Sequence, residues 1–146
     1  MATKADFTEE EWKHLQKGVT GAGLLVSMAD RGFFDSFKEA GALAHHLADA
    51  REHADNELIR EISHVKGTGG FGVTERPDRL EHETMDALHA AVATLQAKAP
   101  DALGPYRDLV LDVAQSVAAA AGGGDAAEGA AIGQIRSALG ADGSPA

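Results

Sequence analysis

The sequence predicts an all-α protein, a single-domain bundle of five or six helices around a buried N-terminal helix. Runs with strand-like alternation of apolar residues are absent, and Ala, Leu, Glu, Lys and Gln dominate between the Gly and Pro breaks. A chain of 146 residues, 44% of them hydrophobic, is long enough for one packed core. We expect residues 1–140 to form this helical domain and residues 141–146 to be a disordered tail.

The first helix is predicted over residues 9–29. Thr8 is a suitable N-cap, and Glu11 stands at the third helical position, where a carboxylate completes a capping box. One face of this helix is apolar and consists of Trp12, Leu15, Val19, Ala22 and Val26. Three glycines remove side-chain bulk, so neighbouring helices are expected to approach closely at Gly18, Gly21 and Gly23.

Two further helices are predicted before a glycine-rich loop. The second starts at Phe33 or Phe34 and ends near residue 50, and the third covers about residues 55–65. The boundary between them is hard to place, because residues 51–56 contain neither Gly nor Pro. Four residues of the third helix are predicted to face inward: Leu58, Ile59, Ile62 and Val65.

Three more helices complete the predicted bundle. The fourth covers residues 77–98, with an inner face of Leu80, Met85, Leu88, Val92 and Leu95. The fifth is expected to have Pro105 in its first turn, where no amide donor is needed, and its apolar stripe is Tyr106, Leu109, Val110, Val113 and Val117. The sixth follows the cap formed by Asp125 and Glu128 and presents Ile132, Ile135 and Leu139.

Charge and composition restrict the function classes. The net charge is −10, and the 13 basic residues are scattered, which argues against binding to nucleic acid or to an anionic membrane surface. The longest apolar run, residues 19–29, is too short to insert across a bilayer. The chain has no cysteine and does not start with a signal-peptide pattern, so we expect a cytoplasmic protein.

The glycine-rich loop spells a dinucleotide-binding fingerprint with Gly67, Gly69 and Gly72. That motif functions between a buried strand and a helix N-terminus, whereas here a helical pattern precedes it and the next helix begins several residues later. The sequence therefore predicts an interhelical loop and no bound cofactor. Phe71, in the middle of this loop, is a candidate contact for a protein partner.

Carboxylates and histidines on both sides of the loop have a spacing used by metal sites in helix bundles. One helical stripe contains Glu57, Glu61 and His64, and the other contains His82, Asp86 and His89. Three of these residues are predicted to point away from the apolar faces and three to lie on the flanks, which disfavours a buried site. The first group is Glu57, His64 and Asp86, and the second is Glu61, His82 and His89. A surface site for zinc, iron or nickel and two solvated helix faces remain as alternatives.

A second candidate metal cluster lies in the second helix and beyond it. His46, Asp49 and His53 share one face if that helix continues unbroken, and such a set is suited to zinc or nickel. No serine stands in a nucleophile motif, so the sequence favours a protein that is not an enzyme.

Part of the chain resembles TerB-like tellurite-resistance domains, which are compact helical bundles of bacteria. The similar stretches are residues 7–12, residues 106–109 with Val113 and Ala114, and Glu128 with Ile132, Ile135 and Leu139. The resemblance implies a helical bundle with a role in stress response. The Asp-Gly-x-x-x-x-x-Glu repeats of such domains are absent here, so no site residue is carried over.

Three functions follow as hypotheses. The first is a non-catalytic protein that acts through contacts with a protein partner or a second copy, using the Phe71 loop or the alanine-rich helices. The second is a protein that binds a divalent metal with the stripes described above. The third is a carrier of a small apolar ligand, held beside the glycines of the first helix.

Overall fold

The computed structural model describes residues 4–29, 45, 48–49, 52, 57–63, 77–120 and 126–140. A short 3-10 turn, η1 (Lys4–Asp6), precedes five α-helices, which are α1 (Glu9–Ala29), α3 (Glu57–Ile62), α4 (Pro77–Lys98), α5 (Pro100–Ala120) and α6 (Ala126–Ala138). The described residues 45, 48 and 49 of the predicted second helix are also helical, and so is residue 52, which lies beyond its predicted end. Within the described residues all regular structure is helical, so the prediction of an all-α bundle is confirmed.

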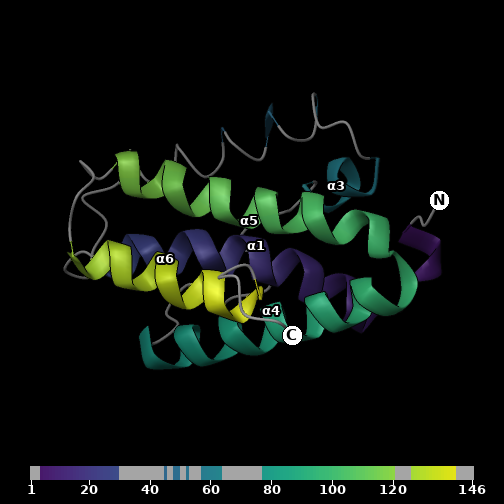
Figure 1. Ribbon diagram of the computed structural model, residues 1–146, viewed down its shortest axis with the longest axis horizontal. Helices are drawn as coiled ribbons and strands as arrows, with labels where there is room; N and C mark the ends of the chain where they lie inside the picture. The colour runs from purple at the N-terminus through teal and green to yellow at the C-terminus, as the bar shows by residue number, and fades with distance from the viewer. Residues whose placement is uncertain are drawn as a thin grey trace.

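Helix α1 lies at the centre of the bundle (Figure 1). It packs most extensively against α4 and also contacts α5, α6 and α3. Its predicted inner face is buried in full, at Trp12, Leu15, Val19, Ala22 and Val26. The start and end of α1 agree with the predicted residues 9–29, which indicates that the capping box correctly marked its beginning.

The other helices bury the faces that their apolar spacing predicts. In α4, the predicted residues Leu80, Leu88 and Leu95 are buried, and Met85 and Val92 are partly buried against the core. The whole predicted stripe of α5 is buried, and so are Ile135 and Leu139 from the last helical segment. In α3, Leu58, Ile59 and Ile62 are buried, whereas Val65 lies outside the described residues.

The predicted start of α5 was wrong. We expected Pro105 in the first turn, but the helix begins at Pro100 and Pro105 lies inside it. Two buried alanines, Ala99 and Ala102, continue the apolar stripe backwards from Tyr106 at helical spacing. The free energy gained by burying these alanines offsets the loss of the backbone hydrogen bond that a proline inside a helix removes. Pro100 occupies the first helical position, which suits a proline.

Helices α1, α4 and α5 meet closely at Gly18. A Cβ atom added to Gly18 would lie 2.5 Å from the Tyr106 hydroxyl oxygen and 3.0 Å from Leu88 Cδ2. The Tyr106 hydroxyl is fully buried and donates a 2.7 Å hydrogen bond to the Leu15 carbonyl oxygen of α1. The predicted close approach at Gly18 is therefore confirmed, and the residue that approaches is the single tyrosine of the chain.

The C-terminal end of α6 is closed by a glycine and an arginine. Gly140 has a φ of 68°, a left-handed conformation that favours glycine and often ends a helix. Arg107 of α5 donates a 2.7 Å hydrogen bond from Nε to the carbonyl oxygen of Leu139, the residue after α6, where the last carbonyl groups of a helix need such partners. This bond joins α5 to the end of α6.

Within the part of the chain that the structure describes, two buried threonine hydroxyls, those of Thr20 and Thr84, have no hydrogen-bond partner. Because an unpaired buried hydroxyl is unfavourable, we expect Thr84→Val, which keeps the shape of the side chain, to raise the free energy of unfolding by about 1 kcal/mol. Urea unfolding followed by circular dichroism measures this change. The matched control is Thr94→Val on the half-buried part of the same helix, where we expect little effect. A clear loss of stability in Thr84→Val would contradict the prediction.

None of the helices in the described ranges combines the length with the apolar composition that crossing a bilayer requires.

Candidate functional surfaces

The N-terminal end of α1 is fixed by a reciprocal capping box. The Thr8 amide donates to Glu11 Oε1 at 2.8 Å, and the Glu11 amide donates to Thr8 Oγ1 at 3.1 Å. Phe7 and Trp12 flank the box with ring centroids 5.9 Å apart, which is the hydrophobic contact that often accompanies such a cap. The sequence predicted the box, and the aromatic pair reinforces it.

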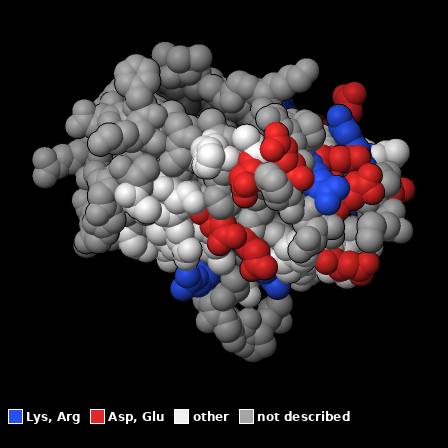
Figure 2. Space-filling model, turned by 90° about the horizontal axis from the view of Figure 1, so that it is seen from above, with Lys and Arg blue, Asp and Glu red and all other residues white. Residues whose placement is uncertain are grey.

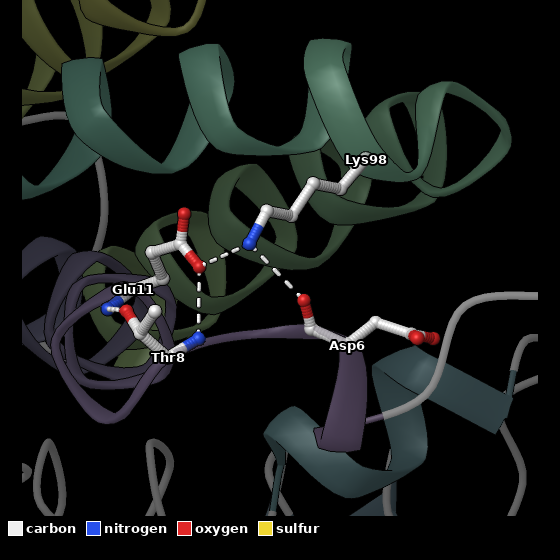
Figure 3. A network of polar contacts seen from close by, with 4 residues as sticks. All are labelled: Asp6, Thr8, Glu11 and Lys98. Atoms are coloured by element: carbon white, nitrogen blue, oxygen red, sulfur yellow. Dashed lines mark hydrogen bonds and ion pairs between the residues drawn. The ribbon is translucent and has the colours of Figure 1, made fainter.

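Lys98, the last residue of α4, contacts both the start of α1 and η1 (Figure 3). Its Nζ lies 2.6 Å from Glu11 Oε1 and donates a 3.1 Å hydrogen bond to the Asp6 carbonyl oxygen. The same ammonium group stands 5.7 Å from the centroid of the Phe7 ring. One cation therefore connects the end of α4 to the cap of α1 and to η1.

The ionisation of Glu11 reflects these contacts. The hydrogen bond from Lys98 is the main reason that the pKa of Glu11 lies below its ordinary value, and the Thr8 amide lowers it further. A carboxylate with a lowered pKa gives stability that is present at neutral pH and is lost as the pH falls through that pKa. Glu11 thus has a structural role, because both of its partners belong to the helix cap and the bundle.

Tyr106 is the other group with a clearly shifted pKa. Burial raises the pKa of its hydroxyl well above the usual range, so the hydroxyl keeps its proton and acts as a donor. Its acceptor is a backbone carbonyl of α1. This buried side chain is a packing element between α5 and α1.

The first predicted metal stripe lies on α3. Glu57 is exposed, and Glu61 is half-buried, with its Oε2 accepting a 3.2 Å hydrogen bond from the Lys4 amide. His64 lies outside the described residues. The neighbouring Ser63 hydroxyl is buried and donates to the Ile59 carbonyl at 2.8 Å, an ordinary bond within a helix end.

The second predicted stripe lies on the outer side of α4. His82, Asp86 and His89 are all exposed, whereas the sequence predicted that Asp86 points away from the core and that the two histidines lie on its flank. His82 Nε2 and Asp86 Oδ2 are 3.2 Å apart, one helical turn from each other. The structure brings these two groups together.

The two stripes are carried by helices in different parts of the bundle. Helix α3 packs against α5 and α1, whereas α4 packs mainly against α1, and the two helices lie on opposite sides of the bundle in Figure 1. Among the residues that the structure describes, no three His, Asp or Glu side chains are grouped closely enough to hold a metal ion. A shared site between α3 and α4 therefore depends on His64 or other residues outside the described ranges.

The second predicted cluster and the loop contact fall largely outside the described residues. Asp49 is helical and exposed, but His46, His53 and Phe71 are not described. The cluster of His46, Asp49 and His53 and the contact role of Phe71 stay predictions.

The face that carries α5 and α3 is acidic (Figure 2). Helix α5 exposes Asp101, Asp108 and Asp112, and α3 exposes Glu57 with Arg60 nearby in sequence. Figure 2 shows acidic side chains spread over the described part of this face, with a few basic side chains among them.

The outer face of the second half of α4 has a different character. From residue 87 to residue 97 the sequence contains no Asp, Glu, Lys or Arg. The side chains that it exposes are His89, Ala93, Gln96 and Ala97, with Ala90, Val92 and Thr94 half-buried beside them. We call these seven residues the α4 neutral face. A scan of charge along the sequence finds this run together with two others that lack charged residues, 18–29 and 113–124.

Comparisons with protein-family models, with curated proteins and with solved structures find no match to this chain. The resemblance to TerB-like domains accordingly stays a prediction.

Proposed function

We propose that this chain is a non-catalytic cytoplasmic protein that acts by binding a protein partner through the α4 neutral face. The observation that supports the proposal is this uncharged, partly exposed helix surface on a chain with a net charge of −10. Burying uncharged side chains in an interface avoids the desolvation penalty of burying charges, and charged residues are depleted at interface centres for that reason. The absence of cysteine fits a reducing compartment.

The shape of the surface favours a helix as the binding element. Ala90, Ala93 and Ala97 follow the three- and four-residue spacing of a helix–helix seam. Small side chains allow two helix axes to approach to about 8 Å, the short end of the usual range. Eleven helical residues extend about 16 Å, so a stable complex must also use surfaces beside this face.

The charges around the face favour a basic partner. Helix α4 exposes Glu81 and Asp86 just before the α4 neutral face, and the whole chain has a net charge of −10. A second copy of the chain would bring two strongly acidic molecules together. We therefore propose an amphipathic helix with a small apolar stripe and flanking Lys or Arg residues as the partner. The resemblance to TerB-like domains points to stress response as the setting.

A charge placed in the α4 neutral face is expected to weaken the binding of the protein partner. A photo-crosslinking residue at Ala93 should capture the partner in cells, whereas the same residue at Ala119, an exposed alanine of α5, should not. With the captured partner purified, Ala93→Glu is expected to weaken the measured affinity by about tenfold or more, because a buried unpaired charge costs several kcal/mol.

The control for this measurement is Ala119→Glu, which introduces the same charge on another helix and should leave the affinity within about twofold. Equal weakening by both variants would attribute the effect to net charge and contradict the proposal. Light scattering on the purified chain separates the remaining alternative, since a dimer that Ala93→Glu dissociates would identify the partner as a second copy.

A further inference from the structure

The exposed His82–Asp86 pair of α4 places an imidazole nitrogen and a carboxylate oxygen at a separation that suits a metal chelate as well as an ion pair. His82 Nε2 and Asp86 Oδ2 are 3.2 Å apart. Consider a metal ion that binds a histidine nitrogen and a carboxylate oxygen at about 2.1 Å each. If the N–metal–O angle lies between a right angle and the tetrahedral angle, the nitrogen and the oxygen are about 3.0–3.4 Å apart. The observed separation therefore falls in the range that one ion shared by both groups requires.

The spacing along the helix and the exposure of the pair support the same conclusion. Residues four apart lie on one helix face, and two side chains at this spacing bind zinc in known helical motifs. The side chains of His82 and Asp86 are 79% and 66% exposed, so an ion reaches them without any rearrangement of the bundle.

We propose that His82 and Asp86 form a two-ligand surface site for a divalent transition metal, with the other coordination positions left to water or to a group from another molecule. An imidazole nitrogen with a carboxylate oxygen suits zinc, nickel or Cu(II) and does not suit magnesium, which prefers oxygen ligands alone. Of the predicted stripe of His82, Asp86 and His89, the proposed site uses the first two residues and leaves out His89. It does not rest on the proposed protein contact.

Titration calorimetry of the full, tag-free chain with zinc chloride tests the site. We expect His82→Ala and Asp86→Asn each to weaken the binding of one zinc ion by about tenfold or more. Replacing a residue that only supports a metal ligand already weakens metal binding by at least this factor, so the loss of a ligand should do the same. Magnesium chloride should give no binding. Glu81→Gln is the matched control for Asp86→Asn, because it removes the same charge from the adjacent turn of the same helix and should leave zinc affinity unchanged.

A second measurement locates the ion, since the chain has seven histidines. Traces of Cu(II) should broaden the amide NMR signals of residues 82–86 before those of other segments, and His82→Ala should abolish the effect. Asp86→His is expected to tighten Cu(II) and nickel binding, because a second imidazole at this spacing is a better ligand for these ions.

The opposite outcomes are distinct. Broadening centred on another segment, or zinc affinity that is unchanged in both His82→Ala and Asp86→Asn, would overturn the proposal. An equal loss in His89→Ala would replace the two-ligand site with one that includes His89. Circular dichroism of each variant shows that the helices are intact, which is expected for exposed positions.

Discussion

Replacing Trp12 by alanine is expected to lower the free energy of unfolding by about 3–5 kcal/mol, the usual range for removing a large buried aromatic side chain. Trp12 is only 7% exposed and belongs to the main core. It also packs against Phe7 and lies under the Lys4 ammonium group, which stands 5.6 Å from the ring centroid. Small domains have a total stability of about 5–15 kcal/mol, so this single change removes a large share.

Urea unfolding of Trp12→Ala must be followed by circular dichroism, because Trp12 is the only tryptophan of the chain. Trp12→Phe is the control, since it keeps an aromatic ring beside Phe7 and should cost clearly less. Lys4→Met removes the cation above the ring and should cost no more than about 1 kcal/mol. A loss in Trp12→Ala that is as small as the loss in Lys4→Met would show that the N-terminal segment does not belong to the core.

Much of the fold follows from local patterns in the sequence. The limits of α1 and α4 coincide with the predicted ones because each helix starts with a strong local signal, Thr8 with Glu11 in one case and Pro77 in the other. The start of α5 was wrong because two prolines competed for the first turn. Burial of Ala99 and Ala102, which depends on the rest of the bundle, decided between them.

The contacts that join distant segments of the chain could not be predicted from local sequence patterns. Nothing in the local sequence of Lys98 indicates that it meets Glu11, 87 residues away. The same holds for Tyr106 and the carbonyl of Leu15, which are 91 residues apart. Such pairings are set by how the helices pack, and a single sequence shows only which face of each helix is apolar.

The sequence predicted which residues could form the candidate site and left their arrangement in space open. Helical spacing correctly placed His82 and Asp86 on one exposed face, and the structure shows their side chains in contact. Spacing carries no information on whether α3 and α4 are neighbours, so it could not decide whether their stripes converge. The sequence predicted a contact surface on the alanine-rich helices but did not choose among them, because the α4 neutral face is defined by the charges it lacks.

The close contact at Gly18 leads to the second large expected effect. Gly18→Ala is expected to destabilise the protein, although alanine is favoured over glycine in a helix by about 1 kcal/mol. The new methyl group would stand 2.5 Å from the Tyr106 hydroxyl oxygen and 3.0 Å from Leu88 Cδ2. Overpacking of this kind costs about 1–3 kcal/mol, and we expect it to exceed the gain in helix propensity because the tyrosine is fully buried and hydrogen-bonded.

A double-mutant cycle with Tyr106→Phe identifies the atom responsible. Tyr106→Phe alone should cost about 1 kcal/mol, the usual contribution of one buried hydrogen bond. In Gly18→Ala/Tyr106→Phe the oxygen that the methyl group would strike is gone, so the double variant should be more stable than the sum of the single losses predicts, by about 0.5–3 kcal/mol. Additive losses would instead attribute the crowding to Leu88.

Gly104→Ala in α5 is the matched control, because nothing lies within 4 Å of a Cβ atom there and the substitution should be neutral or stabilising. The comparison thus separates the conformational cost of a helical glycine from the packing for which Gly18 leaves room.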